Sequence, residues 1–265
     1  MGFYLINRRG VSIVSSLASD YCDQLKKNFK VLYAAFPPNE PLKLGDYGVL
    51  NDTVFVRIGN VSDFNIDIGT PREFPEHKSN LDFSSEGSVE IDFRAKADTA
   101  TPPIKAGIDI SFSSKHSVFF NAAGCVPTSI EDQAALGNAI FALLKADKWQ
   151  KKFCVATSLM KAENTTTAVS SSSNSKISFD ASSDKIANID LTDASLSLSV
   201  THIKDVSLKV TSTGGLTPLL GFSAIQGGIF SSDHFGPLSF MSKLATAPAT
   251  ESISQQSGFF FGQIP

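Results

Sequence analysis

Residues 108–122 read IDISFSSKHSVFFNA and carry the clearest structural signal in the chain. Apolar and polar side chains alternate from Ile108 to Phe112, and the alternation resumes at Val118 beyond the polar pair Lys115-His116. A period of two residues is typical of a β-strand with one face on a core and the other in water. If the pattern is unbroken, this stretch predicts one very long strand.

The same alternation recurs on both sides of this stretch, over residues 89–97, 153–169, 177–181, 194–200 and 206–210. The serine run 170–175 predicts a turn, with 177–181 returning as the partner strand of 153–169. The last two segments are expected to join near His202 to Asp205. We therefore predict strand, strand, helix and then a strand meander over residues 86–211.

Two segments show a helical period instead. Residues 15–32 place Leu17, Tyr21, Leu25 and Phe29 four apart, which is typical of an amphipathic helix. A second helix is expected over 129–146, where Ser129 and Asp132 resemble a capping box. Residues 41–69 are punctuated by glycines and predict small strands joined by turns. The fold class is thus α+β, with a twisted, mainly antiparallel central sheet and packed helices.

Composition narrows the classes of partner. The 265 residues carry a formal net charge of −3, so no whole-chain basic field favours nucleic acid. The three cysteines, Cys22, Cys125 and Cys154, are too few and too widely spaced for a disulfide framework, which favours a reducing, cytoplasmic location. No window of 18 apolar residues predicts a membrane helix, and the serines among residues 11–18 argue against a secretion signal.

Catalytic signatures are missing from the sequence. HExxH, GxSxG, Walker A, GxGxxG and paired CxxC motifs do not occur. The four histidines are scattered singly, and Ser232-Asp233-His234 is better interpreted as a turn, since sequence neighbours cannot supply triad geometry. Cys125 and Cys154 lie in apolar surroundings typical of buried thiols. We therefore expect no enzyme, no metal and no cofactor.

The C-terminal region changes character. Residues 241–257 are rich in Ala, Thr, Ser, Pro and Gln, which indicates an exposed linker. Residues 258–265 then carry Phe259, Phe260, Phe261 and Ile264. Because burying each such side chain contributes ~1.5–3 kcal/mol, we expect this short apolar tail to dock on the core.

Several of these segments together resemble one family, the gasdermins, and in particular the short bacterial gasdermin-like pore-formers. The resemblance covers roughly residues 105–225. The segments that carry it are 108–125, the helix from Ser129, 148–157, 162–181 with its serine-rich turn, and 215–219. The apolar tail behind a linker is also similar to that family.

The resemblance implies a pore-forming domain over residues 1–240, a cleavable linker over 241–257 and an autoinhibitory tail over 258–265. A protease would remove the tail, and the cytoplasmic monomer would then assemble in the inner membrane into a large β-barrel pore. The implied outcome is cell death, in the setting of antiphage defence. Lys243 is the only basic residue between Met241 and Pro265, so we expect the cut after Lys243 or at the neighbouring Leu244.

Local basic clusters are candidates for anionic lipid headgroups, since loss of the tail changes the net charge little. They are Arg8, Arg9, Lys26, Lys27, Lys148, Lys151 and Lys152. The chain departs from bacterial relatives that carry an acylated cysteine near the start, because its first cysteine is Cys22, within the expected helix. Trp149 is expected to fill the core beside the second helix rather than lie at a membrane interface.

A second hypothesis comes from another class of protein. A β-rich structural or assembly protein, such as a virion or appendage subunit, would also have serine-rich sheets and little chemistry, and its aromatic tail would dock on a neighbouring copy. The two hypotheses differ in their expected assembly. An assembly protein oligomerises intact, whereas an autoinhibited pore-former stays monomeric until its linker is cut. A carbohydrate-binding or hydrolytic protein would need a polar aromatic cleft, which the sequence does not indicate.

Overall fold

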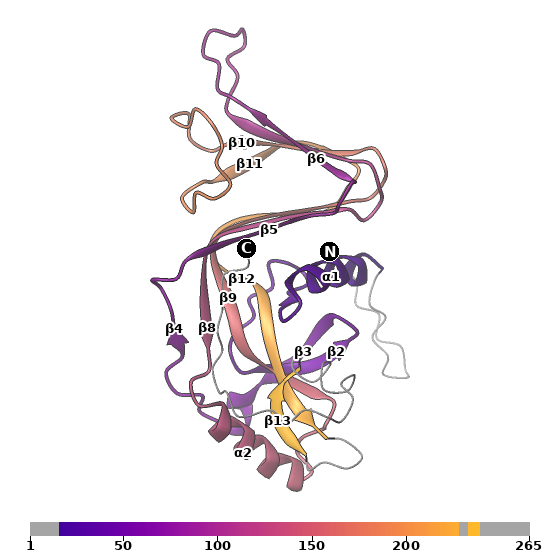
Figure 1. Cartoon of the computed structure of the whole chain (residues 1–265), viewed down its shortest axis with the longest axis vertical. Coiled ribbons are helices and arrows are strands. Elements are labelled where there is room, and N and C mark those ends of the chain that lie inside the picture. Colours follow the sequence, from indigo (N-terminus) through magenta and orange to yellow (C-terminus); the bar gives the residue numbers. More distant parts are fainter. Residues whose placement is uncertain (1–15, 228–232, 239–265) are drawn as a thin grey trace, which may run out of the picture.

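A computed structural model describes residues 16–227 and 233–238 of the chain (Figure 1). The helices are α1 (Ser16–Phe29), the 3-10 turn η1 (Val61–Phe64) and α2 (Gln133–Lys145). The strands are β1 (Tyr33–Ala34), β2 (Asp46–Asn51), β3 (Val54–Asn60), β4 (Arg72–Glu73), β5 (Ser79–Ser84), β6 (Val89–Arg94), β7 (Gly107–Phe112), β8 (Val118–Ser129), β9 (Phe153–Ser170), β10 (Ser175–Ala181), β11 (Leu198–Lys204), β12 (Val206–Gln226) and β13 (His234–Pro237).

The described strands form two sheets, one above the other (Figure 1). The larger, lower sheet has nine strands and is built around β8, β9 and β12. The smaller, upper sheet has four strands in the order β11-β10-β7-β6. All of the strand pairings are antiparallel. The predicted α+β class with a mainly antiparallel sheet is therefore confirmed.

The connectivity at the serine run differs from the prediction. Residues 171–174 are not a hairpin turn, and β10 is not the partner of β9 along its length. Instead β10 belongs to the upper sheet, where it pairs with β7 and β11. Likewise β11 and β12 meet at Asp205 without pairing as a hairpin, and β12 runs on to Gln226. Alternation reveals that a segment is a strand, but it does not reveal which strand lies beside it.

The two predicted helices are confirmed with shorter bounds. On α1 the side chains of Tyr21, Cys22 and Leu25 are fully buried, because the four-residue spacing puts them on one stripe. The predicted role of Ser129 is wrong, since Ser129 ends β8 and pairs with Arg72. Asp132 is the N-cap of α2, and its side chain accepts a hydrogen bond of 2.8 Å from the Ala135 amide.

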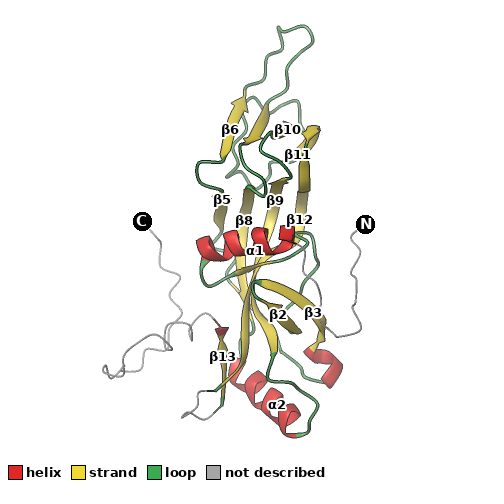
Figure 2. Cartoon of the chain, turned by 90° about the vertical axis from the view of Figure 1, so that its right-hand side faces the viewer, coloured by secondary structure: helices red, strands yellow, loops and turns green. Residues whose placement is uncertain are grey.

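Three hydrophobic clusters hold the molecule together. The first lies around Trp149, which is 4% exposed, so its predicted core position is confirmed. The second lies between α1 and strands β8, β9 and β12, and it contains Cys22 together with Tyr21 and Leu25. The third lies under the upper sheet. Helix α1 thus packs on the lower sheet, close to the level where the upper sheet begins (Figure 2).

Several predicted features lie outside the described residues. They are the basic pair Arg8 and Arg9, the cleavage positions Lys243 and Leu244, the linker 241–257 and the tail residues Phe259, Phe260, Phe261 and Ile264. Within the described part of the chain, neither α-helix has the length and apolar character needed to cross a bilayer.

Candidate functional site

Four strands of the lower sheet are each continuous, through a short bend, with a strand of the upper sheet (Figure 2). The bends lie at 85–88 between β5 and β6, at 113–117 between β7 and β8, at 171–174 between β9 and β10, and at Asp205 between β11 and β12. We call these four segments together the corner. The first arm is 79–129, which contains β5 to β8, and the second arm is 153–226, which contains β9 to β12.

Serine side chains satisfy the backbone where the ladders are interrupted. Ser170 Oγ donates to the Ser114 carbonyl at 2.6 Å and accepts from the Ser117 amide at 2.9 Å. Ser117 Oγ lies 2.9 Å from Ser88 Oγ, so it joins the two bends of the first arm. A short hydroxyl side chain can replace a ladder bond locally, which explains the serine-rich composition of the corner.

Three of the four bends contain a residue with positive φ. The values are 66° at Gly87, 62° at His116 and 53° at Asp205. At Gly87 nothing lies within 4 Å of an added Cβ, so the backbone angle alone favours glycine. A non-glycine residue in the left-handed region costs about 1–3 kcal/mol. An extended strand needs negative φ, so the φ angles of these three residues would have to change before the strands could be straight.

The pairing register shows how the two sheets are related. The two arms pair with each other through β7 and β10 above the corner and through β8 and β9 below it, and we call this junction the inner seam. On the inner seam, Phe112 pairs with Ser175 above the corner and Val118 pairs with Val169 below it. Five residues lie between these pairs on each strand, 113–117 and 170–174. The first and second arms therefore keep one register through the corner, and a straightened seam would need no change of partners.

Within each arm, the pairing of its own strands forms an outer seam: β5 with β8 and β6 with β7 in the first arm, and β9 with β12 and β10 with β11 in the second. Both outer seams change register at the corner. Four residues, 85–88, separate Ser84 from Val89, whereas their partners Phe119 and Phe112 are six residues, 113–118, apart. On the other side, five residues, 171–175, lie opposite Asp205 alone. Both differences, of two and of four residues, are even. Because successive side chains point to opposite faces, an even shift leaves each side chain on its own face.

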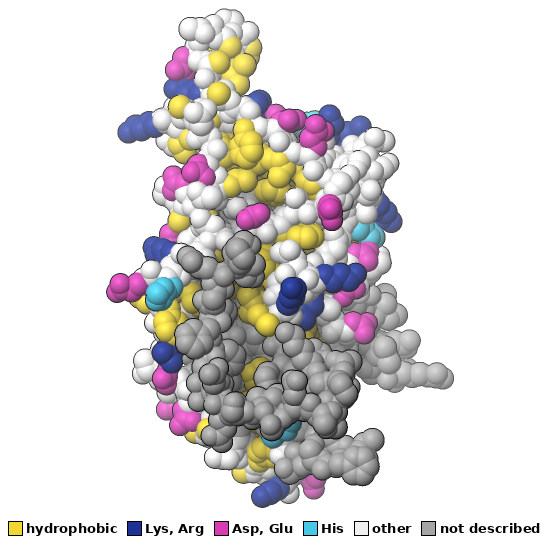
Figure 3. Space-filling view, in the orientation of Figure 1, with side chains coloured by type: hydrophobic (Ala, Val, Ile, Leu, Met, Phe, Trp, Pro, Cys, Tyr) yellow, Lys and Arg dark blue, Asp and Glu magenta, His cyan; other side chains and the backbone are white. Residues whose placement is uncertain are grey.

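The upper sheet has one apolar face. Ile108, Ile110 and Phe112 of β7 are at most 2% exposed, and Ile177 and Phe179 of β10 are fully buried. The segment 182–197 covers this face through residues that include Ile189 and Leu196. Figure 3 shows further hydrophobic side chains at the level of the upper sheet and at the tip above β6.

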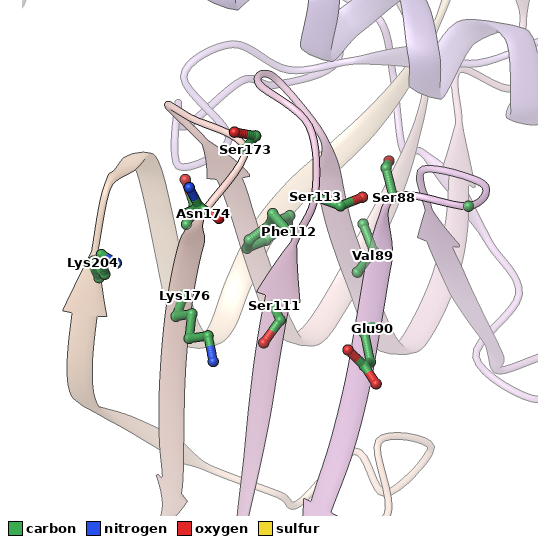
Figure 4. A pocket seen from close by; sticks show the side chains of 12 residues that line it. Ser88, Val89, Glu90, Ser111, Phe112, Ser113, Ser173, Asn174, Lys176 and Lys204 are labelled. Atoms are coloured by element: carbon green, nitrogen blue, oxygen red, sulfur yellow. The ribbon is translucent and has the colours of Figure 1, made fainter.

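The opposite face is polar and hollowed beside the corner (Figure 4). A depression of about 630 Å³ is lined there by one row of register partners and by the adjoining bends. The row consists of Glu90, Ser111, Lys176 and Lys204, one from each strand. Apart from Val89 and Phe112, the residues that line the depression are polar or glycine, which is unlike the apolar lining of most small-molecule sites. Each upper strand is therefore two-faced, with apolar and charged residues on opposite sides.

Arg94 joins three strands on the polar face. Its Nε donates to Asp109 at 2.7 Å, and its Nη2 donates to Asp180 at 3.0 Å. Partial burial alone would raise the pKa of Asp109, but hydrogen bonds from Arg94 and Ser178 outweigh it and hold that pKa below its usual value of 3.8. The stabilisation is thus present above about pH 4 and is lost as the pH falls through the folded pKa.

The substitution Arg94→Met should lower the free energy of unfolding by about 1–2 kcal/mol at pH 7, because two charge-assisted bonds are lost at a partly exposed site. The difference from the parent should shrink at pH 3, because this pH lies below the usual carboxyl pKa of 3.8 and the stabilisation is lost as the pH falls toward the lowered pKa of Asp109. Urea unfolding at both pH values measures it. Lys96→Met is the control, since it removes a single ion pair, between the partly buried Lys96 and the exposed Asp98, and should cost under ~0.5 kcal/mol. An equal loss at both pH values would contradict the assignment.

Five of the lysines that were expected to contact lipid headgroups lie among the described residues, and they fall in two places. On α1, Lys27 is exposed, while Lys26 is partly buried with its Nζ 3.6 Å from the centroid of the Tyr33 ring. Burial lowers the pKa of Lys26 to about 8. Beside α2, Lys148 and Lys152 are exposed and Lys151 pairs with Asp233. The two groups lie at different levels of the molecule and form no common site (Figure 1).

The three thiols are free and buried, as predicted for Cys125 and Cys154. Burial raises the pKa of each to about 12, so the thiolate form is scarce near neutral pH. Among residues 16–227 and 233–238, no group of three or more His, Cys, Asp or Glu side chains is placed to hold a metal ion.

The sequence interpretation missed the corner itself. Its signal is present, however, because a serine-flanked polar interruption occurs at 85–88, 113–117 and 171–174 between alternating segments. An interruption between two alternating runs is usually a hairpin turn, and only the pairing of β7 with β10 distinguishes a bend from a turn.

Comparison with known proteins gives a distant likeness in structure. No protein-family description matches the sequence, and no curated protein matches it. Among solved structures, the chain is similar to the cryo-EM structure of the Gasdermin A3 membrane pore, with 8% identity. The alignment covers 82% of this chain and 93% of that chain, with a TM-score of 0.35. A likeness with a TM-score this low does not establish the function of this chain.

Proposed function

We propose that this chain is an autoinhibited pore-former whose two arms straighten at the corner, insert into a membrane and assemble with further copies into a β-barrel. The observation that carries the proposal is the single register of the inner seam, from Gly107 and Asp180 to Ser129 and Ser158. A bent ladder whose partners already match on both sides of the bend is prepared to become one straight ladder.

Strand length supports the same proposal. A membrane-spanning β-strand needs ~9–11 residues. The upper strands have six or seven residues each, which is too short for each one alone. When the corner residues join the upper and lower strands, each arm provides two continuous segments of sufficient length. Straightening is therefore required if the two-faced upper strands are to span a bilayer.

The two faces of the upper sheet suit the two sides of a barrel wall. The apolar face, with Ile110, Phe112 and Phe179, would contact lipid, and the polar face, with Glu90 and Lys176, would line the lumen. Backbone groups at the edges of an open sheet cannot remain unpaired in lipid. Strands β6 and β11 end the upper sheet, so pairing with further copies would have to close the ring.

The switch in this proposal is removal of the tail by a protease. The tail is tethered through the linker, so its binding to the body is intramolecular, and a cut after Lys243 or Leu244 makes it bimolecular and lowers its effective concentration. The protein would act on anionic inner-membrane lipids from the cytoplasm, with Lys27, Lys148 and Lys152 among the headgroup contacts. Cell death in antiphage defence is the corresponding biological role.

Dye release from vesicles of phosphatidylethanolamine and phosphatidylglycerol tests the proposal directly. A chain of residues 1–243 retains every described residue, and it should release dye while the full chain stays silent. A full chain with a specific protease site in place of residues 241–246 should give release only after that protease is supplied. Vesicles of phosphatidylcholine alone should leak less, since they lack anionic headgroups.

Sedimentation of the intact chain separates the proposal from the assembly-protein hypothesis. A monomeric full chain with a leaking 1–243 chain supports the pore-former. An intact chain that already oligomerises, together with silent vesicles in both cases, would reject it and favour the β-rich assembly protein.

A further inference from the structure

Two side chains of α1 reach from the helix to the corner of the first arm. Asp20 and Gln24 are four residues apart and therefore lie on the same side of the helix. The Asp20 carboxylate pairs with His116 Nδ1. Gln24 Nε2 donates to the His116 carbonyl at 2.9 Å, and Gln24 Oε1 accepts from Ser85 Oγ at 2.5 Å. One glutamine thus bridges both bends of the first arm.

Helix α1 is itself a firm anchor. Tyr21, Cys22 and Leu25 are fully buried on the adjoining stripe of the helix, in one cluster with Val118 and Phe120 of β8. A group that is bonded to Gln24 is consequently tied to the lower core. The Ser85 amide also donates to the Val118 carbonyl at 2.9 Å. The bend at 85–88 is therefore bonded both to α1 and to β8.

His116 is the residue that must move if the first arm straightens. Its φ of 62° belongs to a bend, and its amide donates to the Ser170 carbonyl at 3.1 Å. In a continuous strand its φ would be negative, and its ring and carbonyl would leave their present positions. The bonds from Asp20 and Gln24 can therefore exist only in the bent state.

We propose that Asp20 and Gln24 form an internal latch which holds the first arm folded and must open before the arm can straighten. This inference rests on the proposed function, because only a straightening arm needs such a latch. It places one barrier to activation in the body of the protein, separate from the barrier that the tail provides.

The test measures hydrogen exchange by mass spectrometry in the full chain, with Gln24→Ala and Asp20→Asn. Amides in 85–88 and 113–117 should exchange roughly five- to tenfold faster, as expected for the loss of about one net hydrogen bond. Amides in 171–174 of the second arm are the internal reference and should be unchanged. This readout needs no membrane.

Asp23→Ala is the matched control variant. Asp23 accepts a hydrogen bond from Thr53 and so ties α1 to the turn between β2 and β3, away from the corner. It should leave exchange in 85–88 and 113–117 unchanged. If Gln24→Ala does not alter exchange there, or if Asp23→Ala alters it equally, the latch is rejected.

Dye release by the 1–243 chain supplies the second readout. With Gln24→Ala its initial rate should rise about five- to tenfold, because the barrier to straightening is lower. If the parent 1–243 chain does not leak at all, the proposed function fails, while the exchange data still decide whether the latch exists. If the parent leaks and Gln24→Ala changes neither rate nor exchange, the latch fails and the proposed function stands.

Discussion

The substitution Phe93→Lys in the chain of residues 1–243 should reduce the initial rate of dye release at least about tenfold. Phe93 follows Val89 and Ile91 on the apolar face of β6, but unlike them it does not pack against the third hydrophobic cluster and is 57% exposed. The folded monomer should therefore tolerate lysine. On the lipid face of a barrel, however, lysine costs about 2–4 kcal/mol near the bilayer centre and less toward its edges, and every copy in the ring would bear that cost.

Asp92→Lys is the matched control, because it adds the same side chain one position away, on the polar face. Asp92 is exposed and pairs in register with Asp109. This variant should leak as fast as the parent or faster, because added positive charge favours anionic vesicles. If both variants release dye equally slowly, the added charge on β6 is harmful on either face, and β6 has no lipid face. Unchanged leakage with Phe93→Lys would contradict insertion of this strand.

The substitution Phe179→Ala should lower the free energy of unfolding of the intact chain by about 3–5 kcal/mol, the usual cost of removing a buried ring. Phe179 is fully buried at the centre of the apolar face, opposite Ile108 in the register. Few neighbours can collapse into the space, since Ile108 is fixed in the adjacent strand β7 and Ile177 is fixed two residues away on β10 itself. Urea unfolding, followed by circular dichroism, measures the change.

Phe93→Ala is the control for this second prediction. It removes the same ring from the same sheet at an exposed position, so it should cost under ~1 kcal/mol. Comparable losses for the two variants would show that the upper sheet is not packed as described. A large loss for Phe179→Ala alone would establish that the apolar face is a core in the resting state.

Local patterns predicted most of the individual elements. The four-residue spacing of Tyr21 and Leu25 is enough to predict α1, and the period of two over 108–112 and 177–181 is enough to predict β7 and β10. These patterns depend on the geometry of a single element, which repeats every 3.6 or every two residues whatever surrounds it. The buried state of Trp149, Cys125 and Cys154 was likewise predicted from the local sequence.

The candidate site was much less accessible to sequence interpretation. A serine-rich interruption such as 171–174 can turn a strand back on itself or bend it, and local sequence favours the two outcomes alike. The pairing of β10 with β7, far away in sequence, selects the bend. The latch is equally non-local, because Gln24 and His116 are separated by 92 positions in the chain.

Local sequence alone specifies which residues of this chain form helices and strands, which face of each is apolar, and where the alternation is interrupted, because each of these depends on neighbours within a few residues. Tertiary packing selects the rest: the interruptions meet in one corner, the inner seam keeps its register through it, and α1 bonds to it. Those features depend on distant segments that pack together, and the free energy of that packing is not contained in any local pattern.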